Sequence, residues 1–100
     1  MKENTEEVEM VIVRTFSAGV FFGELINQNG KEVILKNARR LWYWAGAATL
    51  SQLAMEGTSK PSECKFPCSV YKIKLLEAIE ILSVTPKAIK SINDVPIWKE

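Results

Sequence analysis

The stretch Val20-Phe-Phe-Gly-Glu-Leu-Ile-Asn-Gln-Asn-Gly-Lys-Glu-Val-Ile-Leu-Lys36 predicts a β-hairpin and, with it, the fold class. Asn29-Gly30 lies between two strand-like runs, and this pair is the one that a type I′ hairpin turn favours. The predicted strands are Val20–Ile26 and Lys31–Lys36. Gly23, inside the first of them, indicates a bulge or the close approach of another backbone or a ligand.

A further strand is predicted before the hairpin. Met10-Val-Ile-Val-Arg-Thr-Phe16 is rich in β-branched and aromatic residues, which favour strands. Both of its faces are largely apolar, so we expect a central strand that is covered on both sides. Ser17-Ala-Gly19 then forms a turn into the hairpin.

After the hairpin, the sequence predicts another strand and then a helix. Asn37 to Trp44 alternates, which as a strand places Arg40, Trp42 and Trp44 on one face and Arg39, Leu41 and Tyr43 on the other. Ala45–Glu56 has the spacing of an amphipathic helix, and Gly57 suits the position after its end. Thr58–Pro67 is expected to be a loop.

The segment Val70–Val84 is compatible with a helix or a strand. Its many isoleucines and the following Pro86 favour a strand, bulged near Glu77. Thr85-Pro86 resembles a helix N-cap followed by proline at the first helical position, so a short helix should follow and end before Val95-Pro96.

Together these elements predict an α+β fold: an antiparallel sheet of about five strands, one inserted helix and a short C-terminal helix. The sheet could stay open or curl into a small barrel, and both alternatives remain. Residues 1–8 are expected to be a disordered acidic tail. Residues 9–100 should form a single α+β domain.

Charge and hydropathy exclude several classes of protein. A net charge of +1 is too small for a protein that binds long nucleic acids through their phosphates. The acidic N-terminus is unlike a secretory signal, and no apolar run approaches the roughly 20 residues of a membrane helix. We therefore expect a cytoplasmic location with no membrane partner.

The chain contains no histidine. This excludes zinc sites that use histidine, Ser-His-Asp and Cys-His nucleophiles, and histidine general bases. Cys64-Lys-Phe-Pro-Cys68 supplies at most half of a zinc site, and two unpaired structural thiols are the simpler interpretation. The dinucleotide and P-loop signatures are also absent. We expect a protein that is not an enzyme and holds no cofactor or metal.

The stretch Asn37-Ala-Arg-Arg-Leu-Trp-Tyr-Trp-Ala-Gly46 is the main candidate for binding. Guanidinium groups bind phosphates, and aromatic rings stack on bases. Strand alternation would put the two arginines on opposite faces, one toward a ligand and one toward an interface. The same residues also suit a core, a salt bridge or a subunit interface. Arg14, in the turn that leads to Gly19, could add an anion contact, although an ordinary hairpin connection is the favoured interpretation of this turn. The candidate ligand-binding residues are Arg14, Asn37, Arg39, Arg40, Trp42 and Trp44.

Four segments carry a resemblance to a family of small phage and prophage proteins of formerly unknown function. They are Arg14-Thr-Phe-Ser-Ala-Gly-Val20, Asn37-Ala-Arg-Arg-Leu-Trp-Tyr-Trp-Ala-Gly-Ala47, Lys65-Phe-Pro67 and Ser91-Ile-Asn-Asp-Val-Pro-Ile-Trp98. This resemblance implies a phage origin and no known catalytic motif. In size, expected topology and Arg/aromatic chemistry, the chain also resembles phage anti-defence "sponge" proteins, which sequester nucleotide signals of the Thoeris and CBASS immune systems.

Two functions follow as expectations. The first is non-catalytic sequestration of a small nucleotide immune signal, of the cyclic ADP-ribose type or a cyclic oligonucleotide, in the cytoplasm of an infected bacterium. The alternative is a phage protein-binding module that inhibits or redirects a host protein through the aromatic cluster. An enzyme acting on a nucleotide fits least. We also expect a homo-oligomer with pockets between subunits, because the apolar faces and three tryptophans exceed what so small a core can cover.

Overall fold

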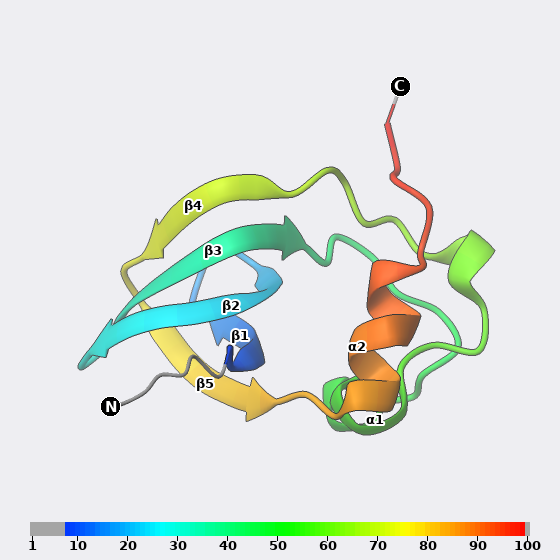
Figure 1. Cartoon of the computed structure of the whole chain (residues 1–100), viewed down its shortest axis with the longest axis horizontal. Helices are drawn as coiled ribbons and strands as arrows, with labels where there is room; N and C mark the ends of the chain where they lie inside the picture. Colours follow the sequence, from blue (N-terminus) through cyan, green and yellow to red (C-terminus); the bar gives the residue numbers. More distant parts are fainter. Residues whose placement is uncertain (1–7, 100) are drawn as a thin grey trace.

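A computed structural model describes residues 8–99, which form five strands, two α-helices and one turn of 3₁₀-helix (Figure 1). The elements in chain order are β1 Met10–Thr15, β2 Val20–Asn29, β3 Glu32–Arg40, α1 Leu50–Glu56, η1 Pro61–Glu63, β4 Val70–Leu75, β5 Ala78–Ser83 and α2 Pro86–Asn93. The α+β prediction is therefore confirmed. The predicted tail of residues 1–8 lies outside the described residues except for Val8, which is exposed.

All neighbouring strands are antiparallel, and their order in the sheet is β4-β3-β2-β1-β5. Strands β4 and β5 occupy opposite edges, yet only Leu76 and Glu77 separate them in the chain. The sheet must therefore curl strongly to bring its two edges to one corner, as Figure 1 shows. It does not close into a barrel, because no ladder joins β4 to β5.

Strand β1 lies inside the sheet, and the prediction that both of its faces are covered is confirmed. Val11, Ile12 and Val13 are fully buried. Ile12 belongs to a core cluster with α1 and α2, whereas Val11 and Val13 belong to a second cluster inside the curl of the sheet. Consecutive side chains of one strand thus stabilise two separate cores.

The predicted hairpin is present, with its turn moved by one residue. Asn29 pairs with Glu32, so Gly30 and Lys31 form the tip. Gly30 has φ +63°, while neither Asn29 nor Lys31 has positive φ. A type I′ turn, which was expected for Asn29-Gly30, needs positive φ at both central residues. Here only the first central residue, Gly30, has positive φ, which is the requirement of a type II′ turn.

The other strand of the hairpin, β3, carries a bulge opposite Gly23. The pairing of β2 with β3 shifts between Phe22 and Glu24, and Asn37 has φ +52°. A Cβ atom at Gly23 would lie 3.1 Å from the Cα atom of Ala38. The close backbone approach expected at Gly23 is confirmed, and a larger residue there would push the two strands apart.

Two other predicted boundaries were wrong. Strand β3 ends at Arg40, so Trp42, Tyr43 and Trp44 do not continue it. Helix α1 begins at Leu50 rather than Ala45, because Gly46, at φ +81°, bends the chain back to receive a hydrogen bond from the Ser59 amide. The segment Val70–Val84 is not helical: it forms β4 and β5, which separate where a bulge was expected.

The predicted C-terminal end of α1 and the predicted N-cap of α2 agree with the structure. The Gly57 amide donates to the Leu53 carbonyl at the end of α1. The Thr85 hydroxyl accepts from the Ala88 amide at the start of α2 and donates to the Met55 carbonyl 2.7 Å away. Thr85 therefore caps one helix and joins it to the other. In the part of the chain described here, no helix is long and apolar enough to cross a bilayer.

Arg39 connects the end of β3 to both segments that lie against it. Its Nε donates to the Pro67 carbonyl at 3.0 Å. Nη1 donates to Ile92 at 3.0 Å, and Nη2 donates to Phe66, Val95 and Pro96 at 2.8–3.1 Å. A single buried guanidinium thus holds the loop before β4 and the segment after α2 against the sheet.

We predict that Arg39→Met destabilises the protein by about 3 kcal/mol or more, because five carbonyls lose a charged donor and most of them remain buried. Arg39→Lys should cost about 2 kcal/mol, since an ammonium has three N–H groups and no planar fork. Urea unfolding followed by tryptophan fluorescence measures both values. The matched control is Arg40→Met, with an expected cost of about 1 kcal/mol, and an equal loss in Arg39→Met and Arg40→Met would contradict the connecting role.

We also predict that Thr85→Ala costs about 1–2 kcal/mol, because it removes both the cap of α2 and the bond to Met55. Thr49→Ala is the matched control. Thr49 caps α1 through the Gln52 amide, and its loss should cost about 1 kcal/mol at most. The same unfolding measurement ranks the two variants, and the reverse order would be inconsistent with the second role of Thr85.

Candidate functional site

The two consecutive arginines lie on opposite faces of the sheet, as strand alternation predicts. Arg39 is opposite Phe22 in β2, and Arg40 is opposite Phe21. Arg39 is buried and Arg40 is exposed. They line different cavities, of about 440 and 380 Å³ respectively. The pair therefore does not form a single clamp for one anion.

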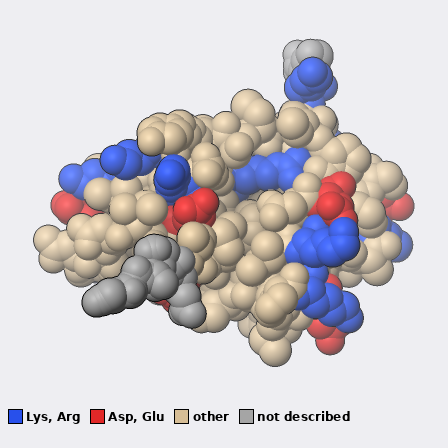
Figure 2. Space-filling view, in the orientation of Figure 1, with Lys and Arg blue, Asp and Glu red and all other residues tan. Residues whose placement is uncertain are grey.

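The cavity beside Arg39, called here the Arg39 cavity, lies between β2, β3, α2 and the segment that follows α2. Figure 2 shows a hollow in the middle of this face with a basic side chain at its bottom. Arg39 is the only lysine or arginine among the described residues that line the cavity. The other polar residues of its lining are Glu24, Asn37, Ser69 and Asn93.

Electrostatics set Arg39 apart from the other basic residues. Burial lowers the pKa of its guanidinium below the ordinary value, and the nearby thiols of Cys64 and Cys68 act weakly in the opposite direction. Within residues 8–99, no carboxylate lies within salt-bridge distance of Arg39. Its partners are neutral carbonyls, so no carboxylate pairs directly with the positive charge in the described structure.

Asn37 has its unusual conformation at the rim of the Arg39 cavity. Its positive φ belongs to the bulge of β3, and asparagine accepts this region more readily than most residues. Its Nδ2 atom donates to Glu24 Oε2 over 3.4 Å. Asn37 and Arg39 are the two predicted site residues that the structure brings together.

Arg14 and Arg40 are engaged elsewhere. The Arg40 guanidinium lies over the Phe21 ring, 4.4 Å from its centroid, and donates to the Ala18 carbonyl at 2.6 Å. Arg14 pairs with Glu80 at 2.9 Å on the surface. In the turn between β1 and β2, the Ala18 amide donates to the Thr15 hydroxyl. This amide is thus already paired within the turn that could have formed an anion nest.

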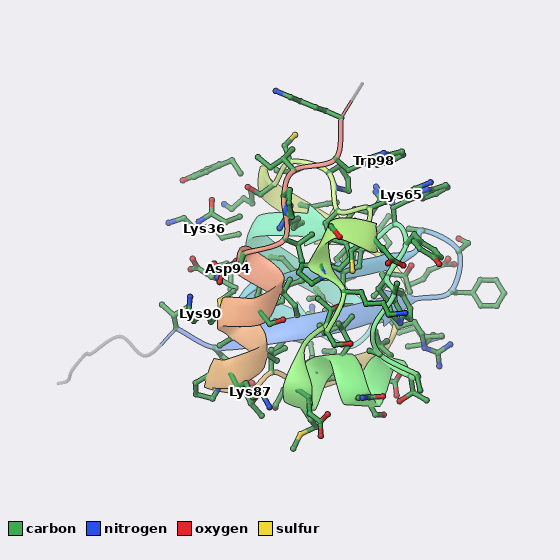
Figure 3. The ribbon with its side chains drawn as sticks, turned by 90° about the vertical axis from the view of Figure 1, so that its right-hand side faces the viewer. Lys36, Lys65, Lys87, Lys90, Asp94 and Trp98 are labelled. Atoms are coloured by element: carbon green, nitrogen blue, oxygen red, sulfur yellow. The ribbon has the colours of Figure 1, made fainter. Side chains whose placement is uncertain are left out.

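Trp42 belongs to a separate surface, called here the aromatic patch, which consists of Trp42, Tyr43, Lys65, Ile97 and Trp98. Two short bridges build it: Tyr43 pairs with Lys65 in antiparallel fashion, and Phe66 pairs with Ile97 in parallel. Three segments far apart in the sequence therefore lie side by side. Figure 3 shows Lys65 beside Trp98, where the C-terminal segment leaves the body of the protein.

The tryptophan rings of the patch are parallel and exposed. The planes of Trp42 and Trp98 differ by 4°, and their centroids are 6.5 Å apart. Trp42 is 63% exposed and Trp98 is 40% exposed. The Lys65 ammonium lies 5.6 Å from the Trp98 ring and 6.0 Å from the Tyr43 ring. The patch thus combines flat apolar faces with one cation.

The sequence prediction did not select Lys65, Tyr43 or Trp98 as site residues. No local pattern connects Trp98 to Trp42, because their proximity depends on both short bridges and on the carbonyl contacts of Arg39. The one available signal was that the third tryptophan, Trp98, lies two residues after the helix stop Val95-Pro96. Trp44, which was selected, is partly buried and packs against the core.

The cysteines form neither a disulfide nor a metal site. Cys64 is buried and Cys68 is exposed, and both are free thiols. No group of three or more cysteine, aspartate or glutamate side chains within residues 8–99 could hold a metal ion. Cys64 lies in the core cluster next to α1 and α2, which agrees with a structural thiol.

Comparison with known proteins gives a family but no annotated relative. No curated protein and no solved structure matches the chain. One family matches residues 8–92, which include Arg39, Trp42 and Lys65 and end before Ile97. Because this range covers most of the sequence, the chain belongs to the family described as a domain of unknown function, DUF6948.

Proposed function

We propose that this protein is a non-catalytic binding protein that sequesters a small nucleotide at the aromatic patch. The observation that carries the proposal is the pair of parallel, exposed tryptophan rings with the Lys65 ammonium lying over one of them. A nucleotide offers the two matching groups: a planar base for the rings and a phosphate for the ammonium. Within the described residues, Lys65 forms no salt bridge, so its charge is available to a ligand.

The spacing of the rings defines how a base would bind. Centroids 6.5 Å apart place the ring planes at most that far from each other. A base inserted between them needs about 7 Å, since each stacking contact takes roughly 3.5 Å. The rings must therefore separate to admit a base, or the base stacks on the outer face of Trp42.

The energy available from one copy argues for an oligomer. Two stacking platforms at about 1–3 kcal/mol each give at most ~6 kcal/mol, whereas a micromolar complex requires ~8 kcal/mol. A second copy that covers the bound nucleotide would supply the difference. Large exposed apolar side chains at other sites, among them Phe16, Leu76 and Ile79, are available for such an interface.

The biological setting that we propose rests on the resemblances noted in the sequence. A phage protein of this kind would remove a cyclic nucleotide signal of a Thoeris or CBASS system in the cytoplasm of the infected cell. The alternative is that the patch binds a host protein. Its favouring observation is Ile97, an aliphatic side chain that is 58% exposed beside the two rings and that suits a protein interface better than a base.

The decisive experiment is calorimetry and thermal shift with a panel of cyclic ADP-ribose isomers, cyclic dinucleotides and cyclic trinucleotides. We expect at least one to bind, and to be recovered chemically intact by mass spectrometry after heating. Adenosine, which lacks the phosphate, and ribose 5-phosphate, which lacks the base, should both bind more weakly. A panel without any heat or thermal shift contradicts nucleotide binding, and an altered nucleotide contradicts a non-catalytic role.

Variants locate the site. Trp42→Ala and Trp98→Ala should each weaken binding by about 5- to 150-fold, the equivalent of one stacking platform. Tyr71→Ala is the matched control, because Tyr71 is another exposed ring with a lysine, Lys36, lying over it. A loss in Tyr71→Ala equal to that in Trp42→Ala would place binding outside the patch. A host protein that is retained by the wild type and released by Trp42→Ala would favour the alternative.

We further predict that the purified protein is a homo-oligomer. Light scattering at micromolar concentration should give a multiple of 11.3 kDa, because exposed apolar side chains gain free energy when a second copy covers them. A mass of one chain, with and without the nucleotide, would contradict this expectation.

A further inference from the structure

The Arg39 cavity has the chemistry of a second binding site, separate from the aromatic patch. The two surfaces are neighbours, since Ile97 lines the cavity and the next residue, Trp98, stacks on Trp42. The nucleotide proposal uses none of the polar residues of the cavity. Its occupant can therefore be considered independently.

The carbonyls around Arg39 leave part of its guanidinium without a hydrogen bond within the described residues. A guanidinium has five N–H groups: one on Nε, two on Nη1 and two on Nη2. In Arg39, Nε is used once, Nη1 donates once, and both N–H groups of Nη2 are shared among three carbonyls. One N–H of Nη1 therefore has no acceptor among the described residues. Arg39 is 7% exposed, so bulk water reaches this group poorly, and an acceptor in the cavity would satisfy it.

The positive charge of Arg39 also lacks a direct partner within the described residues. Carbonyl oxygens satisfy N–H groups but do not neutralise a unit charge, and no carboxylate lies within salt-bridge distance of Arg39 in the described part of the chain. A buried cation attracts an anion more strongly than an exposed one does, because solvent screens it less. The rim adds hydrogen-bond donors from Asn37, Ser69 and Asn93. An anionic group is the natural occupant of this end of the cavity.

The lining of the cavity limits the negative charge and the size of the anion that it can hold. The carboxylate of Glu24 also lines the cavity and would repel a doubly charged phosphate more than a single negative charge. The fork of Arg39 is already occupied by carbonyls, so bidentate binding of a phosphate is not available. The remaining walls are apolar, with Phe22 and Val95 buried at the bottom. A volume of about 440 Å³ falls within the range of small-molecule sites.

We propose that the Arg39 cavity binds a small organic monocarboxylate, with its acid group at the unoccupied N–H of Arg39 and its short apolar body against Phe22 and Val95. The site goes beyond the proposed function. It requires neither a base nor a phosphate, and it does not depend on the tryptophans of the patch.

The experiment uses 3-methylbutanoate as the probe, with its neutral amide and inorganic phosphate as comparisons. Titration of ¹⁵N-labelled full-length protein should shift the side-chain amide signals of Asn37 and Asn93. The acid should bind at least tenfold more tightly than the amide and more tightly than phosphate. An amide that binds as well as the acid would show that charge plays no part, and signals that do not move would show that the cavity is not the site. Either result overturns the proposal.

Two isosteric variants test the charge without removing Arg39. Glu24→Gln should tighten binding of 3-methylbutanoate by about three- to tenfold, because it removes a repelling charge while its amide oxygen can still accept from Asn37. Asn93→Asp should weaken binding by a similar factor, because it adds a negative charge at the rim.

The matched control is Asp94→Asn. Asp94 lies next to Asn93 in the chain but pairs with Lys90 on the surface of α2 (Figure 3). It does not line the cavity, so Asp94→Asn should leave the affinity for 3-methylbutanoate unchanged. Weaker binding in Glu24→Gln, or an equal gain in Asp94→Asn and Glu24→Gln, would overturn the proposal. Trp42→Ala should retain full carboxylate binding while losing the nucleotide, so failure of one site is distinguishable from failure of the other.

Discussion

A buried cation surrounded by neutral carbonyls is the constraint on which this structure depends. Arg39 lies near the end of β3, where the regular pairing of the sheet stops, and its guanidinium continues the hydrogen bonding that the backbone cannot. The acceptors come from two segments that are far apart in the sequence and that the short bridge between Phe66 and Ile97 also joins. Because the fork is planar and rigid, it fixes the direction in which both segments leave the sheet. The segment after α2 contributes Val95 and Ile97 to the cavity and Trp98 to the aromatic patch, so both surfaces depend on this direction.

The sequence predicted local structure well wherever the conformation of a residue depends mainly on its neighbours in the chain. The hairpin, the cap at Thr85 and the glycine after α1 were all recognisable, because each depends on neighbours a few residues away. The strand alternation that separates Arg39 from Arg40 is a local property too, and it held. The end of β3 at Arg40 was not predictable in this way, because the Trp-Tyr-Trp run that follows has the composition of a strand.

The candidate site was less predictable, for a related physical reason. The type of a residue says what it can bind, but not what it already binds. Three arginines had the chemistry of phosphate ligands, and in the folded chain they meet Glu80, the Phe21 ring and a group of carbonyls. Backbone carbonyls are present at every position, so no sequence pattern marks the five that surround Arg39. Lys65 and Trp98 became relevant only once the short bridges had brought distant segments together.

The two-residue connection between β4 and β5 has a consequence for how the chain folds. Strands β1, β2 and β3 pair with their neighbours in sequence, so hairpins can form them early and locally. Strand β5, however, pairs with β1, which is the pairing of greatest sequence separation in the sheet. Since β4 leads directly into β5, the correct docking of β4 on β3 delivers β5 to β1 at little additional loop-closure entropy. The tight corner therefore lowers the loop-closure cost of the longest-range pairing in the sheet.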